Sequence, residues 1–371
     1  MSEFIFENRL TSLRAKFEKL DTDAVWIIQP ENRRYFSNFK AEDTQLNESS
    51  GSLVLTMDKA FLLTDSRYTI QAQKEAVGFE VIIYKEGLVK TLLDIISQLN
   101  IKNFGFEGGH LTWDFYQNLK EGISQRSLSV QLVPLAGPAE EMRKIKEPGE
   151  IELLRESARL MGEVLAQVIE ELRPGQTEKN VAWRIEALIR ERNFADGVAF
   201  PPIVASGPNS ALPHAVPTGR VIGEGEPIVL DVGSRVDGYC SDLTRTVFLG
   251  KVPPYFKQVY KIVREAQLSA LESIRPGMKS TEADSIARDI IKRAGYGEFF
   301  GHSLGHGIGL APHEKPSVGT LRPEELMEGM VFTVEPGIYI PGKGGVRLEE
   351  MVILDKDRLE VLTTNKNFYS F

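Results

Sequence analysis

The chain has 371 residues, a length that favours two domains, because single hydrophobic cores rarely grow past roughly 250–300 residues. Its net charge of −8 gives no general attraction to nucleic acid or to an anionic membrane, so we expect neither as a partner. A single cysteine, Cys240, excludes an internal disulfide and indicates a reducing compartment. No run approaches the about 18 apolar residues that a membrane span needs, and we expect a soluble, cytoplasmic protein.

Strand-like and helix-like segments alternate in the first part of the chain. The predicted strands are 24–29, 52–57, 60–64, 79–84 and 103–107, and the predicted helices are 69–76 and 88–99. The first strand is expected to end in a turn at Pro30-Glu31-Asn32, and Asp58-Lys59 is typical of a tight hairpin between the second and third. We therefore expect a small mixed α/β N-terminal domain at 1–138 with its own core.

The character of the sequence changes after this domain. Residues 139–147 are polar and charged and have a proline on either side, so they are predicted to form a linker. A long amphipathic helix follows at 151–172 and is closed by Arg173-Pro174-Gly175, because proline and glycine stop helices. The second domain is expected at 148–371.

The second domain contains an internal repeat. The segment ELRPGQTE at 171–178 recurs as SIRPGMKSTE at 273–282, and each copy is followed by a predicted helix and by a loop that ends in Pro-His. Each copy then has an apolar strand that carries one acid, a glycine-containing turn, and a second strand that carries another. The four acids are Asp231 and Asp242 in the first copy and Glu335 and Glu349 in the second. We expect an α+β domain whose two halves pack around a pseudo-twofold axis.

This duplication predicts that the four carboxylates converge. The runs before Asp231 and Glu335 are apolar, which is typical of buried strands, and a buried carboxylate is costly unless it is paired or bound to a metal. Four gathered anions repel one another unless cations lie among them. An oxygen-rich site of this kind suits manganese, cobalt or iron(II) better than structural zinc, and four carboxylates can neutralise two divalent ions.

Histidines are concentrated in the second copy. Three of the five in the chain, His302, His306 and His313, lie within twelve residues. The general-base glutamate of a zinc-binding H-E-x-x-H helix is missing, and glycines interrupt the segment. Because imidazole binds metal, stabilises an oxyanion or carries protons, we expect one of these histidines to bind metal beside the carboxylates and the others to line the pocket.

These motifs together resemble a known family. The segments LDVGSRVDGYCSD, GHSLGHGIGLAPHE, TVEPGIYIP and GGVRLEE are similar to those of the pita-bread metallopeptidases, in particular the Xaa-Pro branch of aminopeptidase P and prolidase. The segments ENRRYFSNF and LLTDSRY resemble the amino-terminal domain of the same branch, so the resemblance covers the whole chain. It implies a pita-bread catalytic domain and hydrolysis of the bond between an N-terminal residue and proline.

The resemblance also implies a role for each metal-binding residue. Asp242 and Glu349 bridge two divalent ions, Asp231 holds one of them, and His306 and Glu335 hold the other. Manganese is the expected metal, with cobalt, iron and zinc as alternatives, and a metal-bridged hydroxide is the expected nucleophile. Glu335 is also implied as the group that takes the proton of the attacking water.

Further residues are implied in substrate binding. His214 and His313 are expected to contact the substrate and to stabilise the tetrahedral intermediate, and His302 to line the proline side of the pocket. Arg347 and Tyr339 are expected to orient the site. Two nearby acids are not carried over, Asp237 because it lies in a turn and Glu350 because it should face away from its neighbour Glu349.

Two other functions of the same fold are alternatives. A creatinase-like amidinohydrolase and a metal-free peptide-binding module both lack metal ligands, whereas all five are present here. Methionine aminopeptidases generally lack an N-terminal domain of this kind. The expected partner is a peptide with proline at its second position, and the resemblance implies a homodimer in which the N-terminal domain forms the contact or gates the pocket. The motifs are shared by dipeptidases and aminopeptidases, so this choice stays open.

Overall fold

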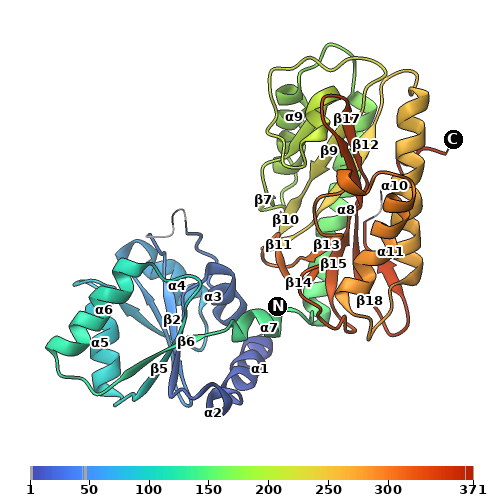
Figure 1. The fold of residues 1–371 in the computed structure, drawn as a ribbon. Coiled ribbons are helices and arrows are strands. Elements are labelled where there is room, and N and C mark those ends of the chain that lie inside the picture. Colours follow the sequence, from blue (N-terminus) through green and yellow to red (C-terminus); the bar gives the residue numbers. More distant parts are fainter. Residues whose placement is uncertain (1–2, 44, 46–47, 364, 371) are drawn as a thin grey trace. The chain divides into compact units, whose positions relative to one another are not determined.

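The computed structural model describes residues 3–43, 45, 48–363 and 365–370, and the chain divides into two compact units, Met1–Met142 and Arg143–Phe371 (Figure 1). A small mixed α/β unit followed by a larger duplicated unit is the architecture expected from the sequence. Within the described ranges, no helix is both long enough and apolar enough to cross a membrane.

The N-terminal unit is built on a six-stranded sheet with the order β4-β3-β2-β1-β5-β6. Its strands are β1 (Ala24–Ile27), β2 (Ser52–Thr56), β3 (Ala60–Thr64), β4 (Glu80–Ile83), β5 (Asn103–Glu107) and β6 (Gln131–Leu135). The pairs β3–β4, β1–β5 and β5–β6 are parallel, whereas β2 runs antiparallel to both β1 and β3. Five strands therefore run in one direction and share one carboxyl edge.

Helices cover this sheet. They are α1 (Glu3–Arg14), α2 (Phe17–Leu20), α3 (Pro30–Ser37), α4 (Thr69–Glu75), α5 (Leu88–Gln98) and α6 (Trp113–Gln125), with a 3₁₀ turn at Ser66–Tyr68. The turn predicted at Pro30-Glu31-Asn32 is wrong, because Pro30 begins α3, where its fixed φ and missing N–H cost nothing. Residues 139–147, predicted as a linker, include helix α7 (Pro138–Arg143).

The first half of the C-terminal unit contains two helices and six strands. These are α8 (Pro148–Glu171), α9 (Glu178–Arg190), β7 (Gly197–Val198), β8 (Ile203–Ser206), β9 (Ile228–Val232), β10 (Ser234–Val236), β11 (Tyr239–Cys240) and β12 (Leu243–Val247), with a 3₁₀ helix at Gly207–Ala211. Strand β9 lies between β8 and β12, and β10 pairs with β11 across a turn. Ser241 and Asp242 lie between β11 and β12 and belong to neither strand.

The second half follows the same plan. It contains α10 (Pro254–Ser273), α11 (Ser280–Arg293), β13 (Gly305–Gly307), β14 (Glu314–Val318), β15 (Val331–Val334), β16 (Gly337–Ile340), β17 (Gly344–Arg347), β18 (Glu350–Leu354) and β19 (Leu359–Val361), with a 3₁₀ turn at Gly297–Phe299. Strand β15 pairs with β18 as β9 pairs with β12, and β16 pairs with β17 as β10 pairs with β11. The duplication predicted from the sequence is therefore confirmed by the strand pairing.

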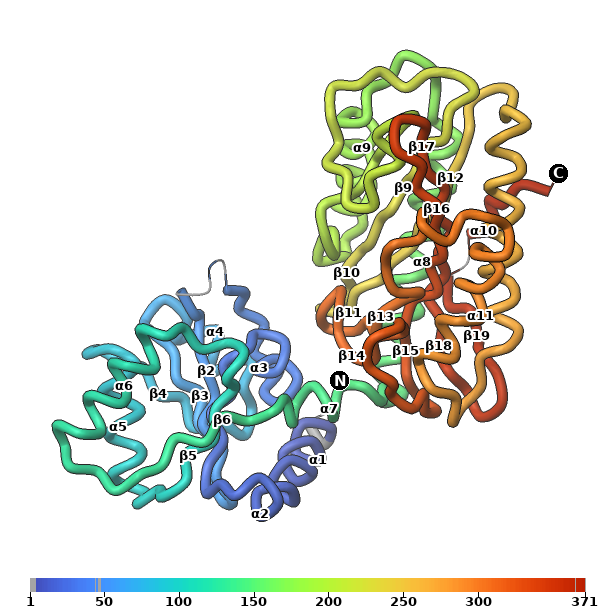
Figure 2. Tube along the Cα trace, in the orientation of Figure 1, coloured from blue at the N-terminus to red at the C-terminus, as the bar shows by residue number. Residues whose placement is uncertain are grey.

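Each half has its own apolar core. One cluster packs α8 and α9 against β8, β9 and β12, and the other packs α10 and α11 against β15 to β18. The halves meet where β12 lies beside β17 (Figure 2). Hydrogen bonds join them there: Thr246 Oγ1 donates to the Arg347 carbonyl at 2.8 Å, and the Glu349 amide donates to the Thr244 carbonyl at 3.1 Å. The polar residues that carry chemistry lie along this seam.

Candidate metal centre

The duplicated strands place the four predicted acids at matched positions. Asp231 lies in β9 and Glu335 directly follows β15, while Asp242 and Glu349 directly precede β12 and β18. All four line one cavity of about 520 Å³. The structure therefore brings the acids of both halves together, as the duplication predicted.

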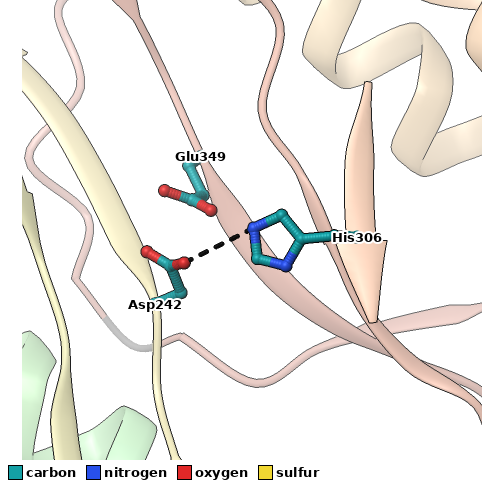
Figure 3. A group of neighbouring side chains, drawn as sticks. All are labelled: Asp242, His306 and Glu349. Atoms are coloured by element: carbon teal, nitrogen blue, oxygen red, sulfur yellow. Dashed lines mark ion pairs between the residues drawn. The ribbon is translucent and has the colours of Figure 1, made fainter. Parts of the chain in front are cut away.

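Three of the predicted ligands form a compact group. One ligand atom from each of Asp242, His306 and Glu349 lies within 4.8 Å of the others, and the side chains point toward one another from different strands (Figure 3). His306 Nε2 is 3.6 Å from Asp242 Oδ2 and 3.3 Å from Glu335 Oε1. Imidazole and carboxylate atoms at these separations can share a cation.

The chemistry of this donor set fits divalent metal. Asp231 Oδ1, Asp242 Oδ1 and Glu349 Oε1 are buried and accept no hydrogen bond from the described protein. Burial, reinforced by the neighbouring carboxylates, raises the pKa of Asp242 well above its usual range and the pKa of Glu349 to about 8. Such a cluster is stable as ionised carboxylates only with cations among its oxygens, so the residues present suit the metal that the sequence implied.

His306 is held with one ring nitrogen facing the acids. Its Nδ1 lies 3.1 Å from the Gly307 carbonyl, which leaves Nε2 toward Asp242 and Glu335. Burial lowers the pKa of His306 to about 3, so the ring is neutral and can donate a lone pair to a metal. The flanking glycines permit this placement, because a Cβ on Gly305 would lie 1.8 Å from the Thr333 carbonyl oxygen.

Two threonines, which the sequence reasoning missed, hold the carboxylates. Thr244 Oγ1 donates to Glu349 Oε2 at 2.6 Å, and Thr333 Oγ1 lies 3.2 Å from Glu335 Oε1 while accepting the His306 amide at 3.1 Å. Thr244 lies two residues after Asp242, and Thr333 lies two residues before Glu335. Along a strand this spacing places a threonine and its acid on the same face. That spacing was the available signal, although threonine is common in strands and does not by itself indicate a role.

Arg347 connects the acids to the aromatic side of the cavity. Its Nη2 donates to Asp231 Oδ2 at 2.6 Å and its Nη1 to the Tyr339 hydroxyl at 2.9 Å. The same hydroxyl lies 2.9 Å from His302 Nε2. Burial raises the pKa of Tyr339 to about 12 and lowers the pKa of His302 to about 4, so both groups are neutral around pH 7. The chain of contacts Asp231–Arg347–Tyr339–His302 thus fixes one wall of the site.

The remaining predicted histidines also line the cavity. His313 lies with its ring centroid 4.1 Å from that of His306, and burial lowers its pKa. His214 lines the same cavity, whose apolar lining residues are Phe200, Pro201, Pro202, Ile203, Pro213, Ala215, Val216 and Pro217. The cavity therefore combines an acidic floor, three further histidines and an apolar side.

The two acids that the sequence excluded lie elsewhere. Asp237 occupies the turn between β10 and β11 with a φ of 42°. Glu350 faces away from the cavity and receives Arg245 Nη2 at 2.9 Å. The alternation of side chains along β18 thus separates Glu350 from Glu349 by direction.

Family profiles match nearly the whole chain. The profile of metallopeptidase family M24 matches residues 152–356, and that of the creatinase/prolidase N-terminal domain matches residues 9–145. Because the first covers more than half of the chain and includes every acid described above, it accounts for the catalytic unit. The second accounts for the six-stranded N-terminal sheet.

Individual relatives agree with the profiles. The Xaa-Pro dipeptidase of Pyrococcus furiosus is 35% identical over 357 residues, which cover 96% of this chain and 98% of the relative. The solved structure of Xaa-Pro dipeptidase from Bacillus anthracis superposes with a TM-score of 0.89 at 38% identity and covers 97% of this chain and 98% of its own. That of X-Pro aminopeptidase from Thermotoga maritima gives 0.83 at 36%, with coverage of 94% and 97%. The resemblance seen in the motifs is confirmed: the chain is a peptidase that belongs to metallopeptidase family M24 and has the pita-bread fold.

Proposed function

We propose that this chain hydrolyses the peptide bond between an N-terminal residue and proline, with two divalent ions, manganese in the first place, bound between its halves. The observation that carries the proposal is the intact set of four carboxylates and one imidazole around one cavity, with three buried carboxylate oxygens that accept no hydrogen bond among the described residues. Relatives of the chain are Xaa-Pro peptidases by name, which supports the choice of substrate.

The ligand assignment is the one that the family resemblance implies, and the positions of the donor atoms support it. Asp242 and Glu349 come from different halves, and a ligand atom of each lies within 4.8 Å of one in His306; by the family resemblance they would be shared between the two ions. By the same resemblance, His306 and Glu335, whose Nε2 and Oε1 atoms are 3.3 Å apart, would hold one ion and Asp231 would hold the other. Four carboxylates balance the charge of two divalent ions, and hard oxygen donors suit manganese. When bound, such ions supply a water that is deprotonated near neutral pH and polarise the scissile carbonyl.

The side chains of the protein carry the proton and the developing charge. Glu335 has one oxygen 3.2 Å from Thr333 Oγ1 and stands beside the cavity, so it can accept a proton from the attacking water and return it to the leaving nitrogen. His214 and His313 face the same space and can donate to the oxygen of the tetrahedral intermediate. The Tyr339 hydroxyl, between Arg347 and His302, keeps the His302 ring in one orientation.

Proline preference has a physical basis in this cavity. An Xaa-Pro bond has no N–H, so a site that binds peptides through that donor loses a hydrogen bond with proline. The apolar wall of Phe200, Pro201, Pro202 and Pro213 instead offers surface against which the proline ring can pack. His302 also lines the cavity, with its Nε2 2.9 Å from the Tyr339 hydroxyl.

The test is hydrolysis by metal-depleted protein to which manganese or cobalt is returned. Ala-Pro, Ala-Pro-Ala and Ala-Ala-Ala are the substrates, and we expect manganese to restore cleavage of one or both proline peptides but not of Ala-Ala-Ala. The ratio of the first two distinguishes a dipeptidase from an aminopeptidase. A protein that binds peptide but stays inactive with every metal is instead a binding module, and equal cleavage of Ala-Ala-Ala contradicts the proline assignment.

A further inference from the structure

One loop of the first half supplies much of the lining of the metal cavity. This 207–217 loop consists of the 3₁₀ helix Gly207–Ala211 and the segment 212–217. The residues of the loop that line the cavity are Pro213, His214, Ala215, Val216 and Pro217. Because His214 is one of the two histidines that we assign to the tetrahedral intermediate, the position of this loop matters for the proposed chemistry.

Apolar packing does little to hold the second part of the loop. Residues 212–217 belong to no helix or strand, and of these only Ala215 is buried. Leu212 is 58% exposed and Val216 is 79% exposed. A segment with so few buried apolar contacts moves easily unless polar contacts fix it. The contacts at the ends of the loop therefore decide where it lies.

Glu178, the first residue of α9, binds the chain at both ends of the loop. Its Oε1 accepts the Ser206 amide at 2.8 Å and the Ser206 hydroxyl at 2.9 Å, directly before the loop. Its Oε2 accepts the Thr218 amide at 3.0 Å and the Thr218 hydroxyl at 2.6 Å, directly after the loop. The side-chain amide of Asn209, within the loop, lies 3.0 and 3.1 Å from the two oxygens. One carboxylate thus joins the two ends.

The surroundings of Glu178 suit a carboxylate and no neutral group. The residue is 0% exposed, and each of the hydrogen bonds just described is donated to it. Burial alone would raise the pKa of Glu178, but the hydrogen bonds from Thr218 and Ser206 outweigh burial and lower the pKa. The start of a helix also favours a negative charge. A side-chain amide at this position would turn an N–H toward groups that are themselves donors.

The second half also contacts the loop. The Gly345 amide donates to Ser210 Oγ at 2.8 Å, and Arg347 Nη1 donates to the Pro213 carbonyl at 3.2 Å. Arg347 also binds Asp231, one of the proposed metal ligands. The loop is therefore tied to the metal centre near its middle and to the start of α9 at its ends.

From these contacts we infer that Glu178 is a positioning residue, which fixes both ends of the 207–217 loop and thereby places His214 in the metal cavity. Glu178 does not itself line that cavity. Its effect on hydrolysis rests on the proposed function, whereas its hold on the loop does not. The two can therefore be measured separately.

Hydrogen exchange of the full chain, followed by mass spectrometry, measures the hold on the loop. Glu178→Gln keeps the length of the side chain and replaces one acceptor oxygen with a donor group. Peptides that cover residues 206–218 should then exchange about tenfold faster, because the change removes a hydrogen bond to a charged group. Glu282→Gln is the matched control, since Glu282 lies in the first turn of α11 and is exposed, and it should leave exchange of these peptides unchanged.

A cycle of single and double variants tests whether Glu178 acts through the histidine of the loop. The substrate is Ala-Pro or Ala-Pro-Ala, whichever the unmodified chain cleaves faster with manganese. Glu178→Gln should lower kcat/KM by about 10- to 100-fold, the usual result of a misplaced group, while the affinity for manganese stays within about twofold. In the His214→Ala background, Glu178→Gln should lower kcat/KM by no more than about threefold, because the group that it positions is already gone.

Each other result overturns part or all of the inference. Unchanged exchange of residues 206–218 in Glu178→Gln means that the carboxylate does not hold the loop. Losses that multiply in the double variant mean that Glu178 does not act through His214. A large loss of manganese affinity means that Glu178 acts on the metal centre instead.

A second variant keeps the test valid if Glu178→Gln does not fold. Thr218→Val removes one exposed hydroxyl that donates to Glu178 Oε2, so the fold should persist and exchange of residues 206–218 should rise about threefold. Unchanged exchange in this variant also contradicts the inference. An unmodified chain that cleaves no proline peptide removes the proposed function, whereas the exchange results still decide whether Glu178 holds the loop.

Discussion

The contact between Thr244 and Glu349 offers a sharp test of the metal centre. Thr244 Oγ1 donates to Glu349 Oε2 at 2.6 Å and accepts from Arg347 Nε at 3.1 Å, inside a fully buried strand. Thr244→Val keeps the shape of the side chain and removes only these bonds. A hydrogen bond to a charged group contributes about 1.5–3 kcal/mol, and loss of a group that orients a metal ligand costs about 10- to 100-fold in affinity. We therefore expect the affinity for manganese to fall by about that factor.

Calorimetric titration of metal-depleted protein with manganese measures this change directly. Hydrolysis of a proline peptide at saturating manganese should recover most of the wild-type rate, because Thr244 orients Glu349 and does not contact the substrate. Thr64→Val is the matched control, since Thr64 is also a buried strand threonine but donates to the Ser50 carbonyl in the other unit. A Thr244→Val protein that binds manganese within about twofold of wild type refutes the assignment of Glu349 as a ligand held by this bond.

Three other changes test separate parts of the protein. Asp242→Ala should abolish peptide hydrolysis and reduce bound metal, measured by elemental analysis, with an unchanged circular dichroism spectrum. Tyr339→Phe removes a hydroxyl 2.9 Å from both Arg347 and His302, so kcat should fall about tenfold or more while metal content persists. The burial of Glu314 alone would raise its pKa, but the charges of Lys146 and Arg143 outweigh burial and the pKa is lowered. The contribution of this carboxylate to the free energy of unfolding should therefore be full above about pH 4.5 and be lost as pH falls further. In denaturation experiments over this pH range, the free energy of unfolding of Glu314→Gln should lack this pH-dependent contribution.

The sequence predicted the acids of the site well because their signals are local and doubled. Each acid lies in or directly beside a buried strand, and the second half repeats the first, so the convergence of Asp231, Asp242, Glu335 and Glu349 could be expected from these patterns alone. Five of the six N-terminal strands were predicted for the same reason, since each is a short apolar run, whereas β6, with the sequence QLVPL, was not predicted. Helix α3 was missed because Pro30 indicates a turn as readily as a first helical residue.

Contacts between distant residues could not be predicted in this way. Glu314 is held by Arg143 and Lys146, about 170 positions earlier in the chain, and nothing in either local pattern indicates the other. Trp26 and Ser52 each suit a buried strand, and only the sheet register shows that their unpaired polar atoms share a face. Such features depend on which elements pack together, and apolar periodicity does not specify the partner of a given strand.

One buried arginine of each half forms an ion pair with an acid of the other half. These ion pairs join the halves, and the pair at the metal site leaves a carboxylate oxygen available. Arg347 of the second half binds Asp231 of the first at 2.6 Å, while Arg245 of the first half binds Glu350 of the second at 2.9 Å. Each guanidinium also donates to a further oxygen: Arg245 donates to the Glu349 carbonyl of the other half, and Arg347 to the Tyr339 hydroxyl of its own half. Removal of one partner of a buried ion pair leaves the other charge uncompensated and destabilises a protein by about 3–5 kcal/mol. These pairs therefore oppose separation of the halves. Arg347 uses only one oxygen of Asp231, and the other stays without a donor among the described residues beside the cavity. Arg347 thus fixes Asp231 in position while leaving one of its carboxylate oxygens for a divalent metal.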